Sequence, residues 1–237
     1  HGIGWGERNY HPGKSAGGTT DYGDYNIVIL EHLAATSNPA RTFSVQDLIP
    51  HWMNRLENGW GSWICTMTRE TYSQVKHGTK IEHLGGISNA MAIRHVAAHA
   101  YYENEDELVD VARKAMFTHK DFSALGGGEF FARVTHRVLR GISPRDAIEE
   151  VAILMGGFFE DKTKQAIAKY EEEANPQTQL SKEQFSDDLA LTSMARLWDI
   201  GRSEPIKVGK ASPTEGTLPG SIYFILKYAN KEDGLKK

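Results

Sequence analysis

The sequence has few of the features that mark several common protein classes. Its 237 residues include a single cysteine, Cys65, so no disulfide can form within the chain, and a reducing compartment such as the cytoplasm is the simplest expectation. The formal net charge of -4 lacks the basic excess that a nucleic-acid or anionic-membrane surface requires. No apolar run is long enough to cross a bilayer. We therefore expect a cytoplasmic protein with neither nucleic acid nor membrane as a partner.

The chain also lacks strand patterns, internal repeats, low-complexity segments and a clear linker. No convincing stretch alternates apolar with polar residues, whereas helical spacing recurs throughout, so we predict an all-α fold. The hydrophobic fraction of 40% is ordinary for a globular protein. We expect a single all-α domain over 1–237. Because no initiator Met opens the chain and its first residues resemble the middle of a loop, we expect both ends of the domain to be missing.

Two helix starts are marked by capping residues. Ser44 precedes an apolar stripe, and Asp47 three residues later completes a capping pair. Pro50 is expected to kink this helix or displace its start. Ser143 followed by Pro144 is a strong N-terminal signal, because proline suits the first helical position.

Three further helices are expected to follow glycines. One runs through "ISNAMAIRHVAAHAYY" after a glycine pair, one through "FFARVTHRVLRG" after a glycine triplet, and one through "SIYFILKYANKED" after a Pro/Gly loop.

The stretch from Thr20 to Asp24 has two interpretations. A hydroxyl and carboxylates at the mouth of a helix suit a hard cation such as Mg²⁺, which prefers oxygen ligands. Thr and Asp are equally ordinary at a helix start, where acids interact favourably with the helix dipole. On these residues alone, the helix-start interpretation is the stronger one.

Other candidate sites have structural interpretations as well. The loop with Gly86, Ser88 and Asn89 before a helix suits a phosphate, or is simply a tight turn with a cap. His95 and His99, four apart, suit zinc or another transition metal but have no third ligand in the sequence. Cys65, flanked by apolar residues, is expected to be a small buried side chain.

Taken in order, four stretches resemble the ADP-ribosylglycohydrolase family. They are "GGTTDYGDYNIVILEHL", "GGISNAMAIRHVAAHAY", "ARKAMFTHKD" and "TLPGSIYFILKYANKEDGL". Within the family they are most similar to the branch of jellyfish J1-crystallin and selenoprotein J. The resemblance implies an ADP-ribosylglycohydrolase-like orthogonal helical bundle. It also implies a Mg²⁺-dependent hydrolase that cleaves the glycosidic bond of ADP-ribosyl or related nucleotide-ribosyl groups.

The resemblance assigns roles to particular positions. Thr20 and Asp21 match the start of the family's metal motif, and Asp21 and Asp24 are the implied catalytic carboxylates. The implied substrate-binding residues are Tyr22, Gly86, Ser88, Asn89 and His119. The implied partner is a small molecule that contains ADP-ribose, or an ADP-ribosylated protein.

The first motif departs from the family pattern. Tyr22 and Gly23 stand where the family has Asp and Thr, and the family's second carboxylate motif is not in the chain. A second Mg²⁺ therefore loses its expected ligands. Two alternatives to the hydrolase follow: a catalytically degenerate, crystallin-like structural or ligand-binding relative, and a transition-metal enzyme that uses His95 and His99.

Overall fold

The computed structural model describes residues 14–15, 17–35, 43–60, 63–85, 93–174 and 214–229. All long regular elements in these ranges are helices and none is a strand, which confirms the predicted all-α fold. The chain divides into two compact units, His1–Ala132 and Arg133–Lys237. The single domain over 1–237 stays a prediction. None of the described helices is long and apolar enough to span a bilayer.

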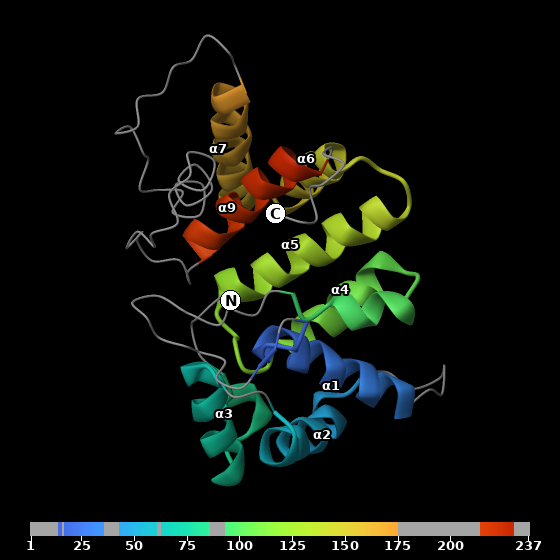
Figure 1. The fold of residues 1–237 in the computed structure, drawn as a ribbon, viewed down its shortest axis with the longest axis vertical. Coiled ribbons are helices and arrows are strands. Elements are labelled where there is room, and N and C mark those ends of the chain that lie inside the picture. Colours follow the sequence, from blue (N-terminus) through green and yellow to red (C-terminus); the bar gives the residue numbers. More distant parts are fainter. Residues whose placement is uncertain are drawn as a thin grey trace. The chain divides into compact units, whose positions relative to one another are not determined.

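Within its described residues, the first unit contains four complete α-helices, two short 3₁₀ helices and the beginning of a longer α-helix. These are α1 (Asp21–Ala35), α2 (Val45–Asn58), α3 (Thr66–Lys76), η2 (Ile81–His83), η3 (Val96–Ala100), α4 (Glu105–Ala115) and α5 (Phe122–Leu139). Helix α1 packs against α2 and η3, and α4 also packs against η3 (Figure 1). The α1 helix therefore lies in the middle of the contacts that shape this unit.

Helix α2 begins where the sequence predicts. The Ser44 hydroxyl accepts a hydrogen bond from the backbone N–H of Asp47 at 3.3 Å, so this serine is the N-cap. Pro50 lies inside the helix and leaves its start in place. Trp52 of α2 is fully buried and meets Phe117 edge-on, with 5.0 Å between ring centroids. This contact fixes the segment that follows α4 against α2.

Three predicted helices differ from the structure. The run after Gly85 and Gly86 forms the 3₁₀ helix η3 in its described part, where it packs against both α1 and α4, and tertiary packing commonly overrides helical propensity. Helix α5 starts at Phe122 and takes in the glycine triplet, whose residues are buried. The expected Pro/Gly loop near residue 219 lies inside α9 (Thr214–Tyr228). In each case the sequence signal was local and the outcome is set by packing.

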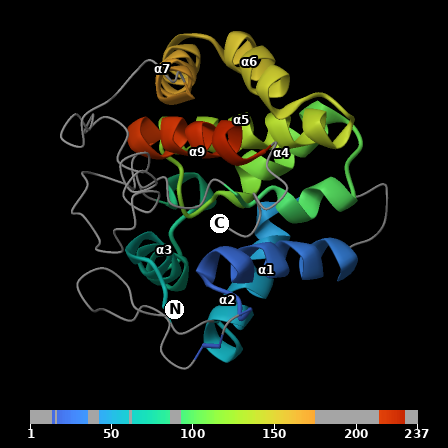
Figure 2. The ribbon, with the colours of Figure 1, turned by 45° about the horizontal axis from the view of Figure 1, so that its top comes forward.

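The second unit holds the end of α5 together with α6 (Pro144–Met155), α7 (Gly157–Ala174) and α9. Helix α7 packs against both α6 and α9 (Figure 2). Ser143 caps α6 by accepting the Asp146 N–H at 3.1 Å, as predicted. Two successive glycines with positive φ, Gly156 at 63° and Gly157 at 46°, form the sharp corner between α6 and α7.

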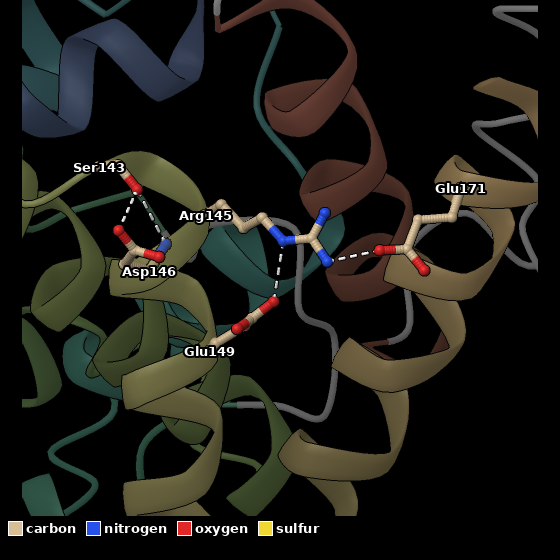
Figure 3. Close-up of polar contacts among 5 residues, drawn as sticks. All are labelled: Ser143, Arg145, Asp146, Glu149 and Glu171. Atoms are coloured by element: carbon tan, nitrogen blue, oxygen red, sulfur yellow. Dashed lines mark hydrogen bonds and ion pairs between the residues drawn. The ribbon is translucent and has the colours of Figure 1, made fainter.

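A surface ion-pair group joins α6 to α7. Arg145 lies between Glu149 on its own helix, at 2.9 Å, and Glu171 on α7, at 2.5 Å (Figure 3). These side chains are about half exposed, so solvent screens the pairs and each contributes about 1 kcal/mol at most. The group helps to orient α7 on α6. The candidate site residues predicted from the sequence all belong to the first unit.

Candidate functional site

Both predicted carboxylates lie in the first turn of α1. Asp21 is 2% exposed and Asp24 is 1% exposed. The backbone carbonyl of Thr20 accepts the N–H of Asp24 at 2.9 Å, which makes Thr20 the residue from which the helix starts. The helix-start interpretation is therefore confirmed. It leaves the cation interpretation open, because a carboxylate at a helix start can also bind a ligand.

Asp24 is paired with an arginine from the next helix. The Arg55 Nη2 of α2 lies 3.1 Å from the Asp24 Oδ1, and the Thr19 hydroxyl donates to the same oxygen at 3.3 Å. The Arg55 Nη1 also lies 3.8 Å from Glu31. The buried carboxylate of Asp24 thus receives two donors and ties the start of α1 to α2.

Asp21 has a weaker electrostatic interaction with a second arginine, Arg94. Arg94, just before η3, interacts favourably with the charge of Asp21. Tyr22, beside Asp21, is 40% exposed. Partial burial raises the pKa of Tyr22, and the negative charge of the neighbouring Asp21 raises it further. The aromatic ring of Tyr22 therefore marks the solvent-facing edge of this carboxylate site.

Arg94 is the most unusual residue of the unit, because its charged side chain is only 1% exposed. Its guanidinium stacks on the ring of Tyr25, 3.4 Å from the ring centroid. It donates hydrogen bonds to the carbonyl of Ala115 at 2.8 Å and to the hydroxyl of Thr118 at 2.6 Å. Burial lowers the pKa of Arg94, and the neighbouring Tyr25, Cys65 and Asp21 oppose that change.

His119 is fixed in one tautomer by this arginine. The Arg94 Nη2 lies 3.2 Å from the His119 Nδ1, and because a guanidinium can only donate, Nδ1 accepts and the ring proton sits on Nε2. The Nε2 atom lies 3.9 Å from the Cys65 sulfur. Burial, followed by the charge of Arg94, lowers the pKa of His119 to about 2. His119 is therefore neutral at physiological pH.

Cys65 belongs to the same group of side chains. It is buried, as predicted, but it also caps α3 by accepting the backbone N–H of Thr68 at 3.4 Å. The Thr68 hydroxyl lies 3.0 Å from the Cys65 sulfur and is hydrogen-bonded to the Tyr25 hydroxyl. We call these connected side chains the Arg94 network; its members are Tyr25, Cys65, Thr68, Arg94, Thr118 and His119.

The predicted substrate-binding residues separate into three groups. Tyr22 is at the edge of the carboxylate site, and His119 is fully buried within the Arg94 network. Gly86, Ser88 and Asn89 lie outside the described residues. The residue before them, Gly85, has φ of +96°, and a Cβ there would lie 2.7 Å from the carbonyl oxygen of Phe117. Gly85 thus lies against the backbone that leads to Thr118 and His119, where only glycine fits.

His95 and His99 are hydrogen-bonded to each other, with 3.1 Å between Nδ1 of His95 and Nε2 of His99. Burial and the neighbouring ring lower the pKa of His95 to about 3. Within the described ranges, no group of three or more His, Cys, Asp or Glu side chains is placed to hold a metal ion. The transition-metal hypothesis therefore has no third ligand from these ranges.

Two residues that shape the site were missed in the sequence. Arg94 had a usable signal, because a single arginine within the apolar run "AIRHVAA" is either exposed or paired in the core. Arg55 had none, since it is one of several charges on an amphipathic helix and its partner lies 31 positions away. The arrangement offers two buried carboxylates, of which Asp24 is ion-paired with Arg55, beside an exposed aromatic ring.

Comparison with known proteins identifies the family of this chain. The family model described as ADP-ribosylglycohydrolase matches residues 2–236. Neither the curated proteins nor the solved structures include a match.

Proposed function

Because the chain belongs to the ADP-ribosylglycohydrolase family, we propose that it hydrolyses the glycosidic bond at the ribose of an ADP-ribosyl or related nucleotide-ribosyl group. The observation that carries this proposal is the family match over nearly the whole chain, which supports a glycohydrolase-type function. The proposed substrate is an ADP-ribose-containing small molecule or an ADP-ribosylated protein. Similarity to the J1-crystallin and selenoprotein J branch, and a cytoplasmic location, remain predictions.

We propose that a divalent cation binds at the start of α1. The Thr20 hydroxyl and the Asp21 carboxylate are oxygen donors, and Mg²⁺ commonly uses one or two carboxylates and keeps several waters. When bound, Mg²⁺ orients ribose hydroxyls and makes a water more acidic. Asp21, a buried carboxylate in the first turn of α1, would hold the cation.

The remaining side chains have distinct proposed roles. Asp24 is the proposed general base, which would take a proton from the attacking water while Arg55 and Thr19 hold its carboxylate in one orientation. Tyr22 is exposed beside Asp21 and would stack on a base or a ribose. His119 would not touch the substrate; it would help to hold Arg94 and Cys65 in position, through its contacts with both.

A specific observation favours a second candidate, a structural or ligand-binding relative without turnover. Asp21 and Asp24 are at most 2% exposed, and Arg55 already pairs with the Asp24 carboxylate. With Tyr22 and Gly23 in the metal motif, such a site could retain the ligand and lack the metal-dependent rate. This candidate predicts ADP-ribose binding that is indifferent to Mg²⁺.

The test is calorimetric titration of the full chain with ADP-ribose, with and without Mg²⁺, together with release of ADP-ribose from an ADP-ribosylated protein. For the wild type we expect binding that needs Mg²⁺. Asp21→Asn should weaken it by about tenfold or more, the loss of one charge-assisted contact. Asp47→Asn is the matched control, because Asp47 is an exposed acid in the first turn of α2.

The outcomes separate the candidates. Binding and hydrolysis that require both Mg²⁺ and Asp21 support the hydrolase. Binding that ignores Mg²⁺ and Asp21→Asn supports a binding module, and absence of ADP-ribose binding contradicts the proposed substrate class.

A further inference from the structure

We propose that Lys120 is a positioning residue for substrate binding, because by holding Ile81 it keeps Gly85 against the backbone that leads to His119. The inference rests on the proposed function, since Gly85 directly precedes Gly86, one of the predicted substrate-binding residues. It goes beyond that function by naming a residue to which the sequence motifs assign no role.

Gly85 is in close contact with the segment 115–120. A Cβ on Gly85 would lie 2.7 Å from the carbonyl oxygen of Phe117 and 3.3 Å from the Cβ of Lys120, so the two stretches of backbone touch. The backbone N–H of Gly85 donates to the side-chain oxygen of Gln74 on α3 at 3.3 Å. Because η2 ends two residues before Gly85, a contact that holds η2 also sets the position of Gly85.

Lys120 connects the segment 115–120 to η2. Its Nζ donates a short, charge-assisted hydrogen bond to the carbonyl oxygen of Ile81 at 2.5 Å. The same oxygen accepts the backbone N–H of Leu84 at 3.2 Å, so both of its lone pairs are used. Partial burial lowers the pKa of Lys120, and the charge of Glu82 on η2 opposes that change. Lys120 therefore fastens η2 at the point where it leads into Gly85.

Arg94 holds the chain beyond the stretch 86–92 to the same segment. It donates hydrogen bonds to the carbonyl of Ala115 at 2.8 Å and to the hydroxyl of Thr118 at 2.6 Å. Arg94 is only 1% exposed, so its contacts belong to the core, whereas Lys120 is half-buried. Lys120 is therefore the contact that can be removed with the smaller effect on folding.

The experiment measures binding of ADP-ribose to the full chain by calorimetry, in the presence of Mg²⁺. In Lys120→Met, which keeps an aliphatic stem and removes the donor, we expect the Kd to rise about tenfold, because a charge-assisted hydrogen bond that orders the site is lost. Lys120→Arg should bind within about threefold of the wild type, because a guanidinium also donates to a carbonyl. Lys80→Met is the matched control, because Lys80 directly precedes Ile81 and its side chain is 76% exposed.

Hydrogen exchange of the Gly85 amide gives a second readout that does not depend on the substrate. This N–H is bonded to Gln74 while Gly85 stays in place. Lys120→Met should speed exchange of the Gly85 amide about fivefold or more and leave the amides of α3 unchanged. A general loss of stability would instead speed exchange at both places.

Each outcome decides the inference. An unchanged Kd in Lys120→Met, or a loss of affinity that Lys120→Arg does not restore, would overturn it and leave the proposed function intact. Faster exchange throughout α3 in Lys120→Met would also overturn it, because Lys120 would then act on overall stability. A wild type that does not bind ADP-ribose would contradict the proposed function instead. In that case faster exchange of the Gly85 amide alone still supports the holding role of Lys120, and unchanged exchange overturns it.

Discussion

Acidification should destabilise the first unit because it contains two histidines that are buried in the neutral form. The folded-state pKa is about 2 for His119 and about 3 for His95, against 6.5 for an ordinary histidine. Between these values the unfolded chain binds protons that the folded chain does not. The stabilisation is therefore complete above pH 6.5 and is lost as the pH falls.

The size of the effect follows from the proton linkage. For each histidine, lowering the pH from 7 to 5 should cost about 2 kcal/mol of unfolding free energy, since 5 lies well above both folded pKa values. The two together should cost about 4 kcal/mol, a large share of the typical total of about 5–15 kcal/mol. Other groups that titrate in this range would add to the wild-type change, so a variant that removes one histidine is needed.

The assay is denaturant unfolding at pH 7 and pH 5, followed by tryptophan fluorescence. His119→Asn keeps an acceptor for Arg94 and removes the titrating ring. It should be less stable than the wild type at pH 7, and its loss between pH 7 and pH 5 should be smaller by about 2 kcal/mol. His77→Gln is the control, because His77 is exposed after the end of α3.

The argument would be refuted if His119→Asn and the wild type lost the same free energy between the two pH values. It would also be refuted if His77→Gln reduced the loss as much as His119→Asn does. The first result would mean that His119 takes up its proton without unfolding, and the second that the pH effect does not depend on the burial of His119.

Two substitutions test local structure. Gly85→Ala should destabilise the first unit by about 2 kcal/mol or more in denaturant unfolding, because its Cβ would lie 2.7 Å from the Phe117 carbonyl. Gly78→Ala, at φ of +74° with open space around it, should cost only about 1 kcal/mol, and equal costs would contradict the close approach. Ser143→Ala should lower the stability of α6 by about 1 kcal/mol, read from hydrogen exchange of its amides, because the acceptor for the Asp146 N–H is lost. Unchanged exchange would contradict that capping role.

Local chemistry explains why the helices were largely predictable. Ser44 and Ser143 cap helices through bonds to residues three positions along the chain, so the signal and its partner are both in one short stretch. The predictions that differ from the structure lie where packing decides. The stretch around His95 satisfies helical periodicity, yet its described part forms the 3₁₀ helix η3, which packs against both α1 and α4.

The candidate site was predictable only in part. Asp21, Tyr22 and Asp24 lie within four consecutive positions, so the sequence alone predicts that they are close together in space. The role of His119 was implied by resemblance, while its neutral state and its tautomer follow from contact with Arg94. Neither property is encoded by the residues next to it.

The sequence by itself determined the all-α class, the capped helix starts, the absence of any internal disulfide and the acidic start of α1. Only the tertiary structure decided which charges meet. Asp24 pairs with Arg55 across 31 positions, and Arg94 reaches Thr118 across 24. The physical reason is that periodicity and capping act over one or two helical turns. A buried charge, by contrast, is satisfied by whichever distant helix brings a matching group into contact.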